Sequence, residues 1–440
     1  MSALELFRGI VAAQKKGTAV GVCSICSAHP AVIDAAFRSG AAGQKPVLIE
    51  STVNQVNQAG GYAGMTPGDF RAFIQSRAGE CGFPPDRIIL GGDHLGPYPW
   101  RKRPAAVAME LARELVAACV SAGYEKIHLD ASMPLGGDAT SSFGGLDPAV
   151  AAQREAELAQ AAEAAFQELA RARPGISPPV YVVGTEVPAP GGITGGSRGV
   201  AVTRAAELNE TVALCRESFQ SHGLRGAWDR VIACVAQPGV EFGDGTIQRY
   251  DREKAAELCG AARAAPGLVI EGHSTDYQSP STLRQLVEDG IAILKVGPAL
   301  TFAMRECLFS LERMERELAP IRGFNGLSNL AETLDRAMRE NPASWQDYYA
   351  GSDAEVRFSR VYSFSDRCRY SWTAPGVRQS VAVLFRNLAE KEMPLTLLSQ
   401  HVPHLYPLIA DGRLAAEPQA LVRESICLVL EGYAAATGGA

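Results

Sequence analysis

The chain alternates between short apolar runs and longer segments whose apolar residues recur at helical spacing. The apolar runs cover residues 19–27, 46–55, 88–94, 126–132, 180–187, 231–237, 268–276 and 291–299. Such nearly continuous runs are typical of strands buried on both faces of a parallel sheet. Segments with helical spacing between them include 104–122, 149–173, 201–221, 252–264 and 280–289. Eight strands alternating with helices predict a (β/α)8 barrel of the α/β class, and an open doubly wound sheet is the alternative.

This pattern is interrupted at two places along the chain. A Gly-rich segment at 134–148 separates the fourth strand from a long helix, and its length is typical of a lid or a binding loop. From residue 301 the pattern becomes mostly helical, with one turn-rich passage at 363–372. We therefore expect a barrel over residues 1–300, with an enlarged connection between the fourth and fifth strands, and a helical extension over 301–440 packed on it.

Composition narrows the class of protein. The 440 residues include 42 Lys and Arg against 48 Asp and Glu, and the resulting charge of −6 argues against nucleic-acid binding. The N-terminus lacks the features of a signal peptide, and no apolar stretch approaches the ~20 residues that span a bilayer. Ten cysteines are scattered through apolar segments, as is typical of reduced thiols. We expect a cytoplasmic protein without a membrane or nucleic-acid partner.

Polar side chains follow the apolar runs where the predicted strands end. They are His29, Glu50, Asp93, His94, Asp130, Glu186, Gln237, Glu271, His273 and Lys295. The carboxyl ends of barrel strands form the mouth in which active sites lie, so we expect these groups to converge there. Each of them alone is more often a cap or a satisfied polar group.

Three of these residues, His94, Glu186 and His273, combine two imidazoles with one carboxylate. That donor set suits a divalent metal with open positions for substrate, and Gln237 or Asp130 can add an oxygen ligand. The alternative is that the two imidazoles only form hydrogen bonds within a polar mouth.

A metal in this position can polarise a carbonyl and stabilise an enediolate. The candidate catalytic carboxylates are Asp93, Glu50 and Asp130, of which Asp93 or Glu50 would exchange a proton with a sugar hydroxyl or with carbon. The sequence contains no GxxxxGK[ST] phosphate loop, no GxGxxG after the first strand and no GxSxG elbow. These absences argue against ATP-dependent phosphoryl transfer, a dinucleotide cofactor and a serine hydrolase.

The last two strands offer candidate phosphate ligands. Lys295 precedes a Gly-Pro turn at Gly297, and the helix that follows has free N–H groups that can receive a phosphate. Ser274 and Thr275 add hydroxyl donors after the seventh strand, where aldolase-type barrels bind phosphate.

Three positively charged candidates have alternatives that remain open. Lys295 can instead be an ion-pair partner of Glu271 or Asp276. In the extension, Arg367 and Arg369 suit bidentate contacts with a phosphate, but surface ion pairs explain them equally well.

Six longer segments resemble one family. They are ESTVNQVNQAGGYAGMTP (50–67), GGDHLGPYPW (91–100), GTEVPAPGG (184–192), EGHSTDYQ (271–278), LKVGPALTFAMRE (294–306) and FSDRCRYSW (364–372). In this order, over essentially the whole chain, they resemble the Z-type (GatZ/KbaZ) subunit family of D-tagatose-1,6-bisphosphate aldolase. The resemblance implies a (β/α)8 barrel related to the class II, metal-dependent ketose-bisphosphate aldolases.

The resemblance also implies roles for single residues. Asp93 and His94 resemble the Asp-His pair of class II aldolases, in which Asp handles a proton and His binds zinc. Glu186 resembles their metal-proximal Glu, and Lys295 resembles the Lys of their last strand. The implied cofactor is a divalent metal, Zn²⁺ first and Mn²⁺, Co²⁺ or Mg²⁺ as alternatives.

Three departures from those aldolases alter the implied metal set. Gln237 stands where they have a metal-binding His in the sixth strand. Their His-Gly in the seventh strand is Glu271-Gly272 here, with His273 one step further on. Gly297 or Pro298 replaces the Asn of their last strand, which touches the substrate.

The resemblance offers three functional hypotheses. We favour a metal-dependent 4-epimerase that converts D-tagatose 6-phosphate to D-fructose 6-phosphate by breaking and remaking the C3–C4 bond, in tagatose and galactitol catabolism. The alternatives are a non-catalytic subunit that stabilises a separate class II aldolase chain, and a tagatose-6-phosphate kinase. We expect a ketose-phosphate substrate, no nucleotide cofactor and a homo-oligomer.

Overall fold

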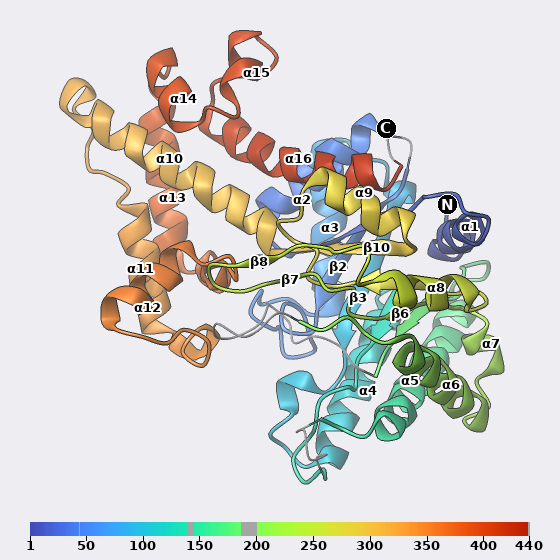
Figure 1. The fold of residues 1–440 in the computed structure, drawn as a ribbon. Coiled ribbons are helices and arrows are strands. Elements are labelled where there is room, and N and C mark those ends of the chain that lie inside the picture. Colours follow the sequence, from blue (N-terminus) through green and yellow to red (C-terminus); the bar gives the residue numbers. More distant parts are fainter. Residues whose placement is uncertain (44, 140–144, 186–199, 439–440) are drawn as a thin grey trace.

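Eight parallel strands close into a barrel in the computed structural model, which describes residues 1–43, 45–139, 145–185 and 200–438 (Figure 1). The strands are β1 (Val22–Cys26), β2 (Val47–Thr52), β3 (Ile88–Leu95), β4 (Lys126–Leu129), β5 (Val180–Val183), β6 (Val231–Val235), β9 (Val269–Gly272) and β10 (Ile291–Val296). The ring closes because β1 pairs with both β2 and β10. The predicted (β/α)8 barrel is therefore confirmed, and the open sheet is wrong.

Helices surround this barrel and form the extension. Those that lie between the strands are α2 (Pro30–Ala42), α3 (Pro67–Cys81), α4 (Ala105–Ser121), α5 (Pro148–Ala172), α6 (Ala205–Ser221), α7 (Arg225–Trp228), α8 (Ala256–Ala264) and α9 (Pro280–Glu288). A short hairpin of β7 (Glu241–Phe242) and β8 (Ile247–Gln248) follows β6. Proline at the start of α2, α3, α5 and α9 favours helix initiation there, because its missing N–H is not needed in the first turn.

The N-terminal helix α1 (Ala3–Lys15) covers one end of the barrel. Ser2 and Glu5 form a capping box that begins it. Its apolar face, with Phe7, Ile10 and Val11, belongs to one buried cluster with strand residues such as Leu48, Ile89, Val180, Ile232 and Ile293. This end of the barrel interior is therefore apolar, and the polar strand ends lie at the other end.

The extension begins with α10 (Pro298–Arg322), which runs from the end of β10 away from the barrel (Figure 1). It continues with α11 (Leu330–Glu340), α12 (Asp353–Tyr362), α13 (Pro375–Ala389), α14 (Leu395–His401), α15 (Tyr406–Ala410) and α16 (Pro418–Ala436). The last helix, α16, returns to the barrel and packs on α2, α9 and α10. The expected division at residue 300 thus falls inside α10, and the C-terminal helix completes the outer layer of the barrel.

None of the helices among the described residues is long and apolar enough to cross a membrane.

Candidate functional site

Five charged side chains fill the barrel interior just below its mouth. Lys126 on β4 contacts Glu50 Oε1 at 2.5 Å and Glu271 Oε2 at 2.7 Å. Lys295 on β10 contacts Glu50 Oε2, Asp93 Oδ1 at 2.8 Å and Glu271 Oε1 at 3.7 Å. Glu50 and Glu271 therefore each give one oxygen to the deeper lysine and the other to the lysine nearer the mouth.

All five groups are buried, and for four of them (Lys126, Lys295, Asp93 and Glu271) the neighbouring charges shift the pKa towards the charged form. Burial disfavours the ammonium of Lys126, but Glu271 and Glu50 outweigh that effect and raise its pKa. Burial also opposes ionisation of Glu271, yet Lys126 and Lys295 hold the pKa of this carboxyl well below its usual range. Two lysines and three carboxyl groups give the network a formal charge of −1, and such a charge favours a further cation.

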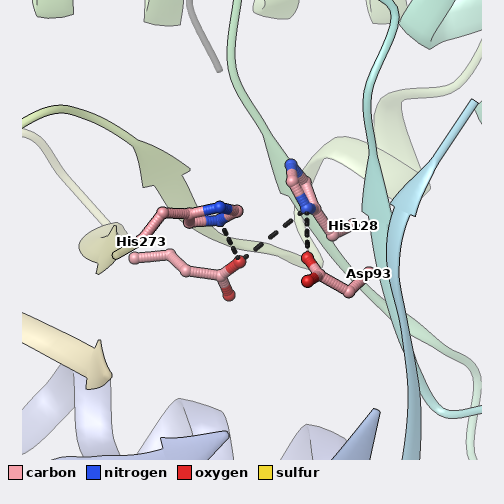
Figure 2. A group of neighbouring side chains, drawn as sticks. Asp93, His128 and His273 are labelled. Atoms are coloured by element: carbon pink, nitrogen blue, oxygen red, sulfur yellow. Dashed lines mark hydrogen bonds and ion pairs between the residues drawn. The ribbon is translucent and has the colours of Figure 1, made fainter. Parts of the chain in front are cut away.

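Three imidazoles lie directly above this network. The ring centroids of His94, His128 and His273 are 4.8 to 5.1 Å apart, and each ring has a carboxylate partner. His94 Nδ1 lies 2.8 Å from Asp130, His128 Nδ1 lies 2.9 Å from Asp93, and His273 Nε2 lies 3.0 Å from Glu271. In Figure 2, dashed lines join the Glu271 carboxylate to both His128 and His273, and a third line joins His128 to Asp93.

The backbone is strained where two of these imidazoles are held. His94 has a φ of 49° and Ser274, next to His273, has a φ of 53°, in the left-handed region that side chains rarely adopt. Strain of this kind persists only where surrounding contacts enforce it, and it is concentrated at functional sites.

Four of the buried residues form a group that could hold a metal ion. Asp93, His128, Glu271 and His273 each offer one ligand atom, and these atoms all lie within 4.8 Å of one another. The Nε2 atom of His128 is buried without a hydrogen-bond partner. Its Nδ1 atom meets both the Asp93 carboxylate and the backbone N–H of His94, and no single tautomer serves both. Nitrogen and carboxylate donors together suit Zn²⁺ and similar divalent ions.

A hollow of about 1040 Å³, open solvent included, lies above the group. Asp93, His94, His273 and Lys295 form part of its floor, and residues 52, 54–55, 62–63 and 296–298 contribute to its walls. The extension adds Arg369, Tyr370 and Thr373, and the Tyr370 ring packs edge-on against Tyr62 at 4.6 Å. The hollow is therefore built jointly by the barrel and the extension.

Comparison with known proteins shows where this architecture belongs. The family model described as "D-tagatose-1,6-bisphosphate aldolase subunit GatZ/KbaZ-like" matches residues 7–438. The chain belongs to the GatZ/KbaZ-like family. It is 45% identical, over 98% of both chains, to a protein of Agrobacterium fabrum named D-tagatose 6-phosphate 4-epimerase.

Two further relatives of the family carry different names. A Klebsiella pneumoniae protein named D-tagatose-1,6-bisphosphate aldolase subunit GatZ is also 45% identical, over 97% of this chain and 98% of its own. A crystal structure from Sinorhizobium meliloti 1021, described as "a probable tagatose 6 phosphate kinase", has 42% identity and a TM-score of 0.85. It covers 94% of this chain and 100% of its own.

The structure brings most of the predicted site residues together. Asp93, His94, His273, Ser274, Lys295, Gly297 and Arg369 all line the hollow. Glu50 and Asp130 are buried next to it, where Glu50 joins the two lysines and Asp130 holds His94. Burial raises the pKa of Asp130, but the hydrogen bond and charge of His94, the charge of His128 and the hydrogen bond from Ser132 together lower it to about 2.

Three predicted residues have other positions, and a fourth cannot be placed. Gln237 does not line the hollow, and its side-chain oxygen accepts from the Gly239 N–H. Thr275 donates its hydroxyl to the Lys295 carbonyl at 2.6 Å. Arg367 is buried, donates to the Ser344 carbonyl and stacks over Tyr348. Glu186 lies outside the described residues.

The sequence left open whether Lys295, Arg367 and Arg369 form ion pairs within the protein. Lys295 makes the ion pair with Glu271 and adds Glu50 and Asp93, but it does not pair with Asp276. Neither Arg367 nor Arg369 forms an ion pair with any residue in the described part of the chain. Arg369 donates instead to backbone carbonyls and to Tyr370 Oη at 2.9 Å.

Sequence reasoning missed Lys126 and His128. Both lie in β4, and Lys126, His128 and Asp130 follow one another at the spacing of two residues that puts side chains on one face of a strand. Charged or ionisable residues at this spacing in an otherwise apolar strand were the signal that could have identified them.

Proposed function

We propose that this chain is a metal-dependent 4-epimerase that interconverts D-tagatose 6-phosphate and D-fructose 6-phosphate. The observation that carries the proposal is the buried group of Asp93, His128, Glu271 and His273, of which Asp93 and His273 line an open hollow. The relative named D-tagatose 6-phosphate 4-epimerase, 45% identical over the same length, supports it.

The donor set fits a divalent cation, for which Zn²⁺ is our first choice and Mn²⁺, Co²⁺ and Mg²⁺ are alternatives. His128, Glu271 and His273 would hold it, with Asp93 and His94 beside them. A cation there supplies Lewis-acid polarisation of the ketose carbonyl. Asp130 fixes the ring of His94 through its hydrogen bond, and Lys126 fixes the side chain of Glu271 from below.

Asp93 is our candidate for the acid-base group because it lines the hollow, whereas Glu50 is enclosed between two lysines. Asp93 accepts the proton of the C4 hydroxyl as the C3–C4 bond breaks and the bonding pair remains on C3. The aldehyde then turns within the hollow, C3 attacks its opposite face, and Asp93 returns the proton to O4. Lys295, 2.8 Å from Asp93, keeps that carboxylate oriented.

The phosphate is assigned to Arg369 of the extension. Its guanidinium lines the hollow without a carboxylate partner among the described residues, and planar guanidinium groups match phosphate oxygens well. Holding the phosphate keeps the aldehyde fragment from leaving while its carbonyl turns, which separates an epimerase from an aldolase.

The test is turnover by the purified protein with each divalent ion, followed by NMR of the two ketose 6-phosphates. We expect interconversion with at least one ion, and a loss of at least a hundredfold in His273→Ala. The matched control is His222→Ala, which should retain activity because His222 caps the C-terminal end of α6 and does not line the hollow. Absence of turnover with all four ions contradicts the proposal.

A second candidate function is a stabilising subunit for a separate class II aldolase chain, which the name of the Klebsiella pneumoniae relative favours. It predicts that this chain co-purifies with such an aldolase and that His273→Ala leaves the complex intact. The kinase hypothesis predicts ADP release with tagatose 6-phosphate, which we do not expect because the sequence lacks a phosphate-loop motif.

A further inference from the structure

The wall of the hollow formed after β9 and β10 is where a barrel commonly binds a substrate phosphate. β9 and β10 are the seventh and eighth barrel strands, and α10 begins directly after β10. The loops after these strands and a helix N-terminus ordinarily supply the phosphate with hydroxyl and N–H donors. Here the corresponding donors are already used within the protein.

Asp276 takes the N–H groups at the start of α10. Its Oδ1 atom accepts from the Gly297 N–H at 3.0 Å and from the Ala299 N–H at 2.8 Å. Pro298 has no N–H, and the Leu300 N–H is bonded to the Gly297 carbonyl. Asp276 is 3% exposed and lines the hollow, so its own carboxylate occupies the place of a bound anion.

The two hydroxyl donors of the neighbouring loop are engaged as well. Thr275 donates to the Lys295 carbonyl, and the Ser274 side chain hydrogen-bonds with Glu241. Glu241 is 1% exposed. A phosphate at this wall would therefore meet the Asp276 carboxylate and few free donors.

The positive charges that the described residues bring to the hollow also leave no cation for a phosphate at this wall. Lys295 contacts three carboxylates, so its charge is compensated within the protein. Arg369 is the lining cation without an ion-pair partner in the described part of the chain. As the lining cation without an ion pair among the described residues, Arg369 matches one phosphate group.

We propose that Asp276 is a specificity-determining residue that fills the anion site at the start of α10, so that the hollow accepts a ketose monophosphate and rejects the corresponding bisphosphate. This inference rests on the proposed function and sharpens it. Tagatose 6-phosphate carries one phosphate, whereas the substrate of a 1,6-bisphosphate aldolase carries two.

The test compares the binding of D-fructose 6-phosphate and D-fructose 1,6-bisphosphate by isothermal titration calorimetry in excess Zn²⁺. We expect the wild type to bind the monophosphate at least a hundredfold more tightly. Asp276→Ser frees two N–H donors and removes a charge, and should reduce this ratio at least tenfold. Asp276→Asn removes only the charge and should give an intermediate ratio. The matched control is Glu155→Gln, which changes a buried carboxyl bonded to the Gly184 N–H outside the hollow and should leave the ratio unchanged.

The proposal is overturned if the wild type binds the monophosphate and the bisphosphate with affinities within threefold of each other. It is also overturned if folded Asp276→Ser or Asp276→Asn has the same ratio of these affinities as the wild type. If the Ser variant does not fold, the Asn variant decides alone. Because binding needs no turnover, the two proposals can fail separately. If the protein is inactive but still prefers the monophosphate, the epimerase proposal is contradicted. If it is active and substitution of Asp276 leaves the ratio of the two affinities unchanged, this inference is contradicted. A protein that binds neither sugar phosphate contradicts both.

Discussion

At the scale of the residue, Lys126 is the charged side chain on which the interior network depends. It is fully buried and neutralises one oxygen of Glu50 and one of Glu271. Lys126→Met leaves one oxygen of each of these buried carboxylates without its cation, and we expect it to lower the free energy of unfolding by about 3–5 kcal/mol in urea denaturation. Lys254→Met is the control, because Lys254 pairs with Asp251 at the surface and should leave the denaturation midpoint unchanged. Equal midpoints for the two variants would contradict this role.

Glu155 gives a pH-dependent prediction at the same scale. Burial between α5 and β5 raises the pKa of this carboxyl from its ordinary 4.5 to about 8. The folded protein therefore keeps a proton that the unfolded chain has lost, and stability decreases as pH rises from 4.5 to 8. Between pH 5 and 8 the unfolding free energy of the wild type should fall by about 3 kcal/mol relative to Glu155→Gln. Parallel pH profiles of the two proteins would show that Glu155 is ionised in the fold.

At the scale of the element, α1 closes the apolar end of the barrel. Phe7 is fully buried against the strands, so Phe7→Ala leaves a cavity and should cost about 3–5 kcal/mol of stability. The exposed Arg8 of the same helix is the control, and Arg8→Ala should be neutral. Because α1 lies at the end opposite the mouth, Phe7→Ala should leave the affinity for the metal unchanged. A matched loss of stability and metal affinity would show that the two ends are coupled.

The return of α16 leads to a second prediction about elements. This helix covers α2 and α9, and its Tyr433 hydroxyl donates to the Thr275 carbonyl at 2.8 Å. A chain shortened to residues 1–322 lacks that cover, and we expect it to be insoluble when expressed. Tyr433→Phe removes only the hydrogen bond and should remain folded, with a loss of about 1–3 kcal/mol for the unsatisfied buried carbonyl. A soluble, cooperatively unfolding 1–322 chain would show that the barrel folds without the extension.

At the scale of the whole molecule, metal binding should stabilise the fold. A ligand that binds only the folded protein adds about 2.7 kcal/mol at a concentration one hundred times its Kd. We expect EDTA to lower the Tm and added Zn²⁺ to restore it, because the ion would join residues of β4 with residues at the end of β9. The double variant His128→Ala, His273→Ala should lose the response. A Tm that changes neither with EDTA nor with added Zn²⁺ would contradict a metal at this site.

Much of this architecture was predictable from the sequence alone. The eight apolar runs identified the eight strands, because a strand buried on both faces of a parallel sheet must be apolar over its whole length. The polar residues that end those runs include Asp93, His94 and His273, which line one hollow. This follows because the carboxyl ends of parallel barrel strands meet at one mouth.

Only the tertiary structure decided how the charges are shared. Lys295 and Glu50 are 245 residues apart in the chain, and nothing local indicates that they pair. The same holds for His128 as a neighbour of Asp93, for Asp276 at the start of α10, and for α16 beside α2. Local sequence determines which segments become strands and helices, because periodicity and capping act over a few residues. Partner choice among buried charges depends on which strands face each other across the closed barrel, and that is fixed only when the ring forms.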